Sequence, residues 1–167
     1  MAAVSARWKL CAQMALSERL GWAYEIAVCE QVMERGQFDL FLLAGRHTLL
    51  ERTASCGFFK TCAKTGTDIV IGGPFNSGLL VGGQTYNYRS VPDEIAAQHQ
   101  QLVAYCAAHH VNIGAAAPQF PLREQVVKSV IPGPKTPGEL SQIVDWMEQD
   151  IPAAFWAGLR DLDGIGA

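Results

Sequence analysis

The sequence has no strong excess of either charge and no long apolar run, and each absence argues against a class of protein. Its 13 basic and 16 acidic residues give a net charge of -3, and no segment gathers Lys and Arg into a stripe. Such a stripe is what a nucleic-acid backbone requires, so we expect no nucleic-acid partner. No apolar run approaches the roughly 20 residues of a membrane span, so we expect no membrane partner either.

Cysteines are few, odd in number and without a CxxC pair. They are Cys11, Cys29, Cys56, Cys62 and Cys106. This pattern is typical of reduced thiols in the cytoplasm rather than of a disulfide framework. The nearest approach to a zinc site is Cys106 with His109 and His110, which offers too few ligands for a closed tetrahedron, so we predict no metal.

The length and the hydrophobic content of the chain are sufficient for one folded domain. The chain has 167 residues, of which 49% are hydrophobic and 17% charged, as is usual for a globular protein. Residues 1–19 are expected to be a poorly defined N-terminal segment, more consistent with a frayed surface helix than with a transit peptide. Residues 20–167 are expected to form the domain.

Helical and strand patterns alternate along that domain. Short apolar runs predict strands at 39–44, 68–71 and 126–131, with a less distinct one at 20–23. Helical spacing, Pro and Gly predict helices at 24–35, 48–63, 92–110, 111–120, 137–148 and from 152 onward. Pro118 is expected to interrupt the fourth of these helices. Strands separated by helices indicate an α/β fold with parallel strands and crossover helices.

Two loops follow predicted strands at their carboxyl ends, where ligands bind in parallel sheets. The first, "GGPFNSG" at Gly72–Gly78, offers flexible backbone N–H groups and a hydroxyl, as an anion-binding nest does. The second, "SVIPGPKTPGEL" at Ser129–Leu140, places Lys135 and Thr136 directly before a helix, whose N-terminus attracts phosphate. The simpler alternative is that each loop is only a Gly-Pro turn.

Four segments in order carry a more specific resemblance: "DLFLLAGRHTLLER", "DIVIGGPFNSGLL", "AAAPQFPL" and "SVIPGPKTPGEL". Together they resemble the carboxyl-terminal half of an aldo-keto reductase, close to the branch of aldose (L-fucose, D-threo-aldose) and pyridoxal dehydrogenases. The resemblance covers roughly residues 20–162. It implies the carboxyl-terminal half of a (β/α)8 TIM barrel, with the barrel incomplete.

The resemblance also implies an NAD(P)-dependent oxidoreductase that passes hydride between NADP or NAD and a carbonyl or hemiacetal carbon. By position, the first loop would hold the pyrophosphate, the second the adenosine ribose or its 2′-phosphate, and a glutamine would lie near the adenine. The cofactor-binding residues so implied are Gly73, Phe75, Ser77, Gly78, Gly133, Lys135, Thr136 and Gln142. The charge of Lys135 favours NADP slightly.

The sequence also departs from the family pattern. The catalytic tetrad of Asp, Tyr, Lys and His has no counterpart, so we predict no catalytic residue here and no activity of the chain alone. The residues at 20–25 lack the Asn that holds the carboxamide, and Ile143 stands where another Asn is expected. Tyr86 and Tyr88 are interpreted as aromatic packing residues.

Two other classes of function stay open. One is a non-catalytic relic that binds a nucleotide or phosphate and docks on a partner, and the other is an unrelated small α/β enzyme with Cys56 or Cys62 as nucleophile. Half a barrel also leaves two open edge strands. We therefore predict that the isolated chain is marginally stable and that it associates with itself or with a complementary half barrel, or aggregates.

Overall fold

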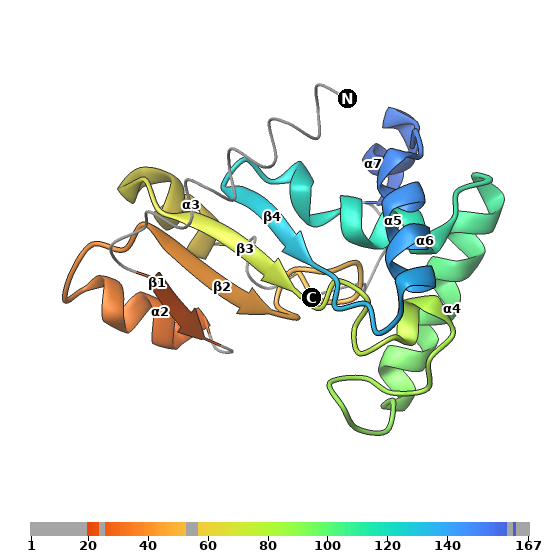
Figure 1. Ribbon diagram of the computed structural model, residues 1–167, viewed down its shortest axis with the longest axis horizontal. Helices are drawn as coiled ribbons and strands as arrows, with labels where there is room; N and C mark the ends of the chain where they lie inside the picture. The colour runs from red at the N-terminus through yellow and green to blue at the C-terminus, as the bar shows by residue number, and fades with distance from the viewer. Residues whose placement is uncertain (1–19, 24–25, 53–56, 160–161, 163–167) are drawn as a thin grey trace.

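The computed structural model describes residues 26–52, 57–159 and 162 in full and the backbone of residues 20–23. Its centre is a four-stranded parallel sheet in the order β1-β2-β3-β4 (Figure 1). The strands are β1 (Leu20–Ala23), β2 (Leu40–Ala44), β3 (Asp68–Gly72) and β4 (Val127–Ile131). All four predicted strands are confirmed.

Helices connect the strands, and the later helices gather on the β4 side of the sheet. The helices are α2 (Ile26–Met33), α3 (Phe58–Thr65), α4 (Asp93–Ala108), α5 (Ile113–Gln119), α6 (Pro137–Glu148) and α7 (Ala153–Leu159), with short 3-10 turns η2 (Leu79–Val81) and η3 (Pro121–Arg123). In Figure 1, α2 and α3 lie with the sheet, whereas α4 to α7 lie together beyond β4. The alternation confirms the α/β class.

The buried side chains form two cores. The first lies between the sheet and α2 and α3, and includes Phe41, Phe58 and Ile69. The second joins α4 to α7 with the segments after β2 and β3, and includes Leu49 and Phe155. The second core therefore supports the loops at the carboxyl ends of the strands.

The predicted helix at 48–63 is wrong in its first half. Thr48–Leu50 are bends rather than helix, with the Thr48 hydroxyl accepting the N–H groups of Leu50 (3.2 Å) and Glu51 (3.1 Å). Helix α3 begins only at Phe58, directly after Gly57. The apolar pair Leu49 and Leu50 that suggested a helical face instead packs into the second core.

The predicted interruption at Pro118 is also corrected. Asn112 caps α5 by accepting the N–H of Gly114 at 2.8 Å, and the helix continues through Pro118 to Gln119. The N–H of Phe120 still reaches the carbonyl of Ala116 at 2.8 Å. Because Pro118 stands next to the last residue of a short helix, its missing donor leaves the hydrogen bond after it intact.

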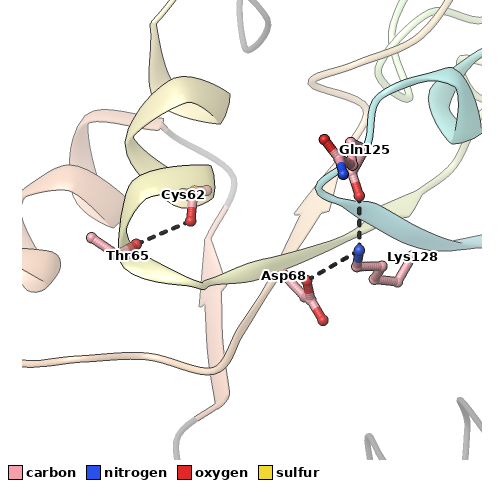
Figure 2. A network of polar contacts seen from close by, with 5 residues as sticks. All are labelled: Cys62, Thr65, Asp68, Gln125 and Lys128. Atoms are coloured by element: carbon pink, nitrogen blue, oxygen red, sulfur yellow. Dashed lines mark hydrogen bonds and ion pairs between the residues drawn. The ribbon is translucent and has the colours of Figure 1, made fainter.

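A polar network holds the amino-terminal ends of β3 and β4 together (Figure 2). Lys128 donates to the carbonyl of Gln125 at 2.8 Å and lies 3.7 Å from a carboxylate oxygen of Asp68. The pairing of β3 with β4 shifts register here, because Ile69 pairs with Val127 whereas Val70 pairs with Ser129. Lys128 is thus the extra residue of a β-bulge.

The described strands do not close into a barrel, so β1 and β4 are the two edges of the sheet. No helix within the described residues combines the length and apolar character that crossing a membrane requires. Residues 1–19, Cys11 and Cys56 lie outside the described residues.

Candidate functional site

The carboxyl ends of β2, β3 and β4 open into one cavity of about 1360 Å³. Both loops singled out in the sequence line it. Of the eight predicted cofactor-binding residues, the cavity wall contains Gly73, Phe75, Ser77, Gly78, Gly133, Lys135 and Gln142. The structure thus brings Ser77 and Lys135 to a single hollow, although their role toward a cofactor stays a prediction.

The loop after β3 is fixed to the sheet and bent tightly. The N–H of Gly73 donates to the carbonyl of Ile131 in β4 at 2.9 Å, which ties the loop to the second loop. Gly73 and Gly78 have φ values of 65° and 94°, and Asn76 and Ser77 have values of 50° and 59°. Non-glycine residues in this left-handed region cost about 1–2 kcal/mol each, and such conformations are common at functional sites.

Asn76 lies on this loop with an unusual environment. It is only 2% exposed and lines the cavity, yet neither its amide nitrogen nor its amide oxygen has a hydrogen-bond partner among the described residues. A buried, unpaired amide costs about 1–3 kcal/mol.

Ser77 supports a neighbouring hairpin. Its Oγ accepts the N–H of Tyr88 at 3.1 Å, and its carbonyl accepts the hydroxyl of Thr85 at 3.0 Å. The Ser77 hydroxyl hydrogen is left available to donate. Tyr86 packs on the second core, as predicted, but Tyr88 is 86% exposed, so the packing interpretation of Tyr88 is corrected.

The loop after β4 ends in the predicted helix, α6, whose bounds are as expected. Thr136 is its N-cap and accepts the N–H of Glu139 at 3.1 Å. The Glu139 carboxylate in turn accepts the N–H of Lys135 at 2.7 Å. Thr136 is not part of the cavity wall, so the structure places it behind Lys135 as a capping residue.

The charges on the cavity wall favour an anionic ligand. Arg46, Arg89 and Lys135 line it, and Glu139 is the one acid among the described lining residues. A cleft with an excess of one charge concentrates ligands of the other. The sequence interpretation missed both arginines because it considered only the ends of β3 and β4. Arg46 lies in the segment that follows β2, which ends at Ala44.

The described cysteines do not support a nucleophile. Burial raises the pKa of Cys62 to about 12, and the pKa values of Cys29 and Cys106 to about 11. Their thiols stay protonated at neutral pH, whereas the thiolate is the reactive form. No group of three His, Cys, Asp or Glu within the described ranges could hold a metal ion.

Parallel strands joined by helices, with a ligand-sized cavity at their carboxyl ends, are typical of (β/α) barrels and of open α/β sheets. A model of the aldo/keto reductase family matches residues 11–163, and the chain belongs to this family. It is 39% identical to a pyridoxal 4-dehydrogenase of Microbacterium luteolum over 81% of this chain. It is also 37% identical to a D-threo-aldose 1-dehydrogenase of a Pseudomonas species over 78% of this chain.

The chain spans about 41% of the length of those two relatives. Solved structures agree on the fold. An aldo-keto reductase from Bacillus halodurans in its holo form matches with a TM-score of 0.66 and 20% identity, over 86% of this chain and 49% of its own. The glycerol dehydrogenase of Gluconobacter oxydans matches with a TM-score of 0.61 and 16% identity. The match covers 86% of this chain and 48% of the glycerol dehydrogenase. The chain therefore has the fold of about half of a (β/α)8 barrel, and the barrel is incomplete.

Proposed function

We propose that this chain is the cofactor-binding part of an NAD(P)-dependent oxidoreductase that acts on an aldose or a pyridoxal-like carbonyl compound. The observation that carries the proposal is the convergence of the loops after β3 and β4 on one cavity. The family membership and the names of the relatives support the reaction class. We also propose a cytoplasmic setting, which the odd number of cysteines without a CxxC pair favours.

The described residues fit a diphosphate in chemical terms. In the bent loop at residues 73–78, the N–H groups of Gly73, Asn76 and Gly78 already donate to carbonyl groups of the chain. The N–H groups of Phe75 and Ser77 and the Ser77 hydroxyl are the donors that the loop would offer to a diphosphate. Lys135 and the N-terminus of α6 add positive charge at the second loop. Gln142, which lines the cavity from α6, would lie near the adenine.

The chemistry itself needs groups beyond this chain. A bound nicotinamide supplies or accepts the hydride, and the residues named here bind the cofactor, orient it and neutralise its charge. The predicted absence of the Asp, Tyr, Lys and His tetrad means that the chain should bind a dinucleotide without turning over substrate. Oxidation of an aldose or of pyridoxal by this chain alone would overturn that part of the proposal.

Reversing the charge of Lys135 tests the site. Lys135→Glu should weaken NADPH binding by roughly tenfold or more, because it replaces attraction of the phosphates by repulsion. The measurement is a titration of NADPH fluorescence with the purified chain. Lys60→Glu, on the exposed surface of α3 and outside the cavity wall, is the matched control and should bind as the wild type does. Equal binding by both variants would remove Lys135 from the site.

We further propose that the edges β1 and β4 are covered by a second copy of the chain or by a complementary half barrel. An unpaired edge exposes backbone groups that another strand can satisfy. Sedimentation velocity should show species larger than a monomer at micromolar concentration. A monodisperse monomer with a sharp cooperative melt would contradict the proposal.

A further inference from the structure

A tight hairpin turn after η2 forms part of the cavity wall. Tyr86 and Arg89 exchange two backbone hydrogen bonds of 3.0 Å, and Asn87 and Tyr88 lie between them with φ values of 49° and 62°. Positive φ at both central residues is typical of a type I′ turn, in which glycine is usual at the second position. Tyr88 occupies that position, so its backbone is strained where glycine would not be.

The side chain of Tyr88 is almost entirely open to solvent. It is 86% exposed, whereas Leu140, the next most exposed of the large apolar side chains among the described residues, is 51% exposed. A single exposed apolar side chain is common on protein surfaces. Here the residue also belongs to the cavity wall and has a strained backbone, and strained residues cluster at ligand sites. The position of Tyr88 therefore calls for a functional explanation.

The turn is held in place from two sides. Ser77, in the loop after β3, accepts the N–H of Tyr88 with its Oγ at 3.1 Å and the hydroxyl of Thr85 with its carbonyl at 3.0 Å. On the side of β2, a Cβ at Gly45 would lie 3.6 Å from Oδ1 of Asn87. The turn thus lies between the segments that follow β2 and β3. A residue positioned in this way loses little backbone freedom when a ligand packs against it.

We propose that Tyr88 is a ligand-binding residue of the cavity, where its ring packs on a planar heteroaromatic ring of the bound ligand. The inference rests on the proposed function, because it requires a ligand in this cavity. Aromatic rings in contact stabilise a complex beyond the area that they bury. A dinucleotide offers two such rings, the nicotinamide and the adenine, and a pyridoxal-like substrate offers one. These three sources share a flat π-system that the Tyr88 ring can cover.

Tyr88→Gly separates a ligand contact from a role in the turn. Glycine relieves the positive φ, so the melting temperature should rise by about 2 °C or more. Loss of the ring should at the same time weaken binding by roughly fivefold or more, measured by isothermal titration calorimetry with NADH, ADP-ribose and pyridoxal. Tyr88→Asn also tolerates this backbone conformation and should lose the same affinity. Tyr88→Phe keeps the ring and should restore most of it.

His110→Gly is the matched control for the relief of strain. His110 also has a positive φ, of 53°, is exposed and lies outside the cavity wall. Its replacement should raise the melting temperature as Tyr88→Gly does and leave the affinities for all three ligands unchanged.

The pattern of losses in Tyr88→Gly identifies the ring that is bound. A loss for NADH alone indicates the nicotinamide, a loss for NADH and ADP-ribose indicates the adenine, and a loss for pyridoxal indicates the substrate ring. Each of these results supports the inference.

Other outcomes separate the inference from the proposed function. If the wild type binds none of the three ligands, the proposed function fails and the inference is overturned with it. If the wild type binds them and Tyr88→Gly binds equally well, only the inference is overturned, and a change in the sedimentation of that variant would assign the ring to a protein contact. A loss in Tyr88→Phe as large as that in Tyr88→Gly would also overturn it, because the ring would not be what binds.

Discussion

Lowering the pH from 7 to 4 is expected to reduce the free energy of unfolding by about 3 kcal/mol through His47 alone. This side chain is 1% exposed, and neither ring nitrogen has a hydrogen-bond partner in the described structure. Its ring lies between Phe59 and Phe120, with centroids 4.8 Å and 4.9 Å away. Burial, and secondarily the positive charge of Arg52, lowers the pKa of His47 from 6.5 to about 4.

The direction of this change in the free energy of unfolding follows from proton binding. Between pH 6.5 and 4 the unfolded chain binds a proton at His47 and the folded chain does not, so acid favours unfolding. Stability is unaffected by this group above pH 6.5, falls as the pH drops through this window, and changes no further below about 4. Urea unfolding at several pH values measures the slope.

His47→Phe is the variant that isolates this contribution. It replaces an unpaired polar ring by an apolar ring in an aromatic environment. The free energy of unfolding should therefore depend less on pH between 6.5 and 4, and it should rise at pH 7 by about 1–3 kcal/mol. Replacing the more exposed His99, whose pKa is lowered by burial to a lesser extent, should leave most of the slope in place. A slope that persists in His47→Phe would show that other groups cause the acid sensitivity.

Gly114→Ala is expected to destabilise the fold by about 2 kcal/mol and to disturb the cavity. A Cβ at Gly114 would lie 2.7 Å from the Trp146 ring, which must therefore move. That ring packs edge-to-face on Phe75 with centroids 6.0 Å apart, and all three residues line the cavity. The strain should thus reach the loop after β3 and weaken dinucleotide binding.

Gly57→Ala is the matched control for this substitution. A Cβ there meets nothing within 4 Å, and its φ of -149° lies outside the left-handed region that favours glycine. Urea midpoints and NADPH titrations should separate the two variants clearly. If Gly114→Ala and Gly57→Ala change stability equally, contact between a Cβ at position 114 and the Trp146 ring is not the cause of the destabilisation.

Local signals predicted the parts of the fold that local contacts determine. The start of α6 followed from Pro137, since a first-turn proline acts within a few residues. The helix at 48–63 could not be predicted correctly, because Leu49 and Leu50 pack against helices far along the chain.

The candidate site was also predicted from the sequence only in part. The rule that ligands bind at the carboxyl ends of parallel strands was sufficient to find both loops. It could not reveal that Asn76 would be buried without a partner or that Arg89 would reach the same cavity, because both depend on how the hairpin after η2 folds back. The contact between Glu139 and the N–H of Lys135 was also not predicted, although it spans only four residues.

The bulge at Lys128 has a consequence for how the open sheet behaves in a crowded solution. A flat, regular edge invites stacking into cross-β aggregates, and proteins counter this with kinks and inward-placed charges. On β4 the extra residue is a lysine paired with Asp68 of the neighbouring strand. The irregular edge resists indiscriminate stacking of identical strands, while a partner whose own strand accommodates the kink can still add to it.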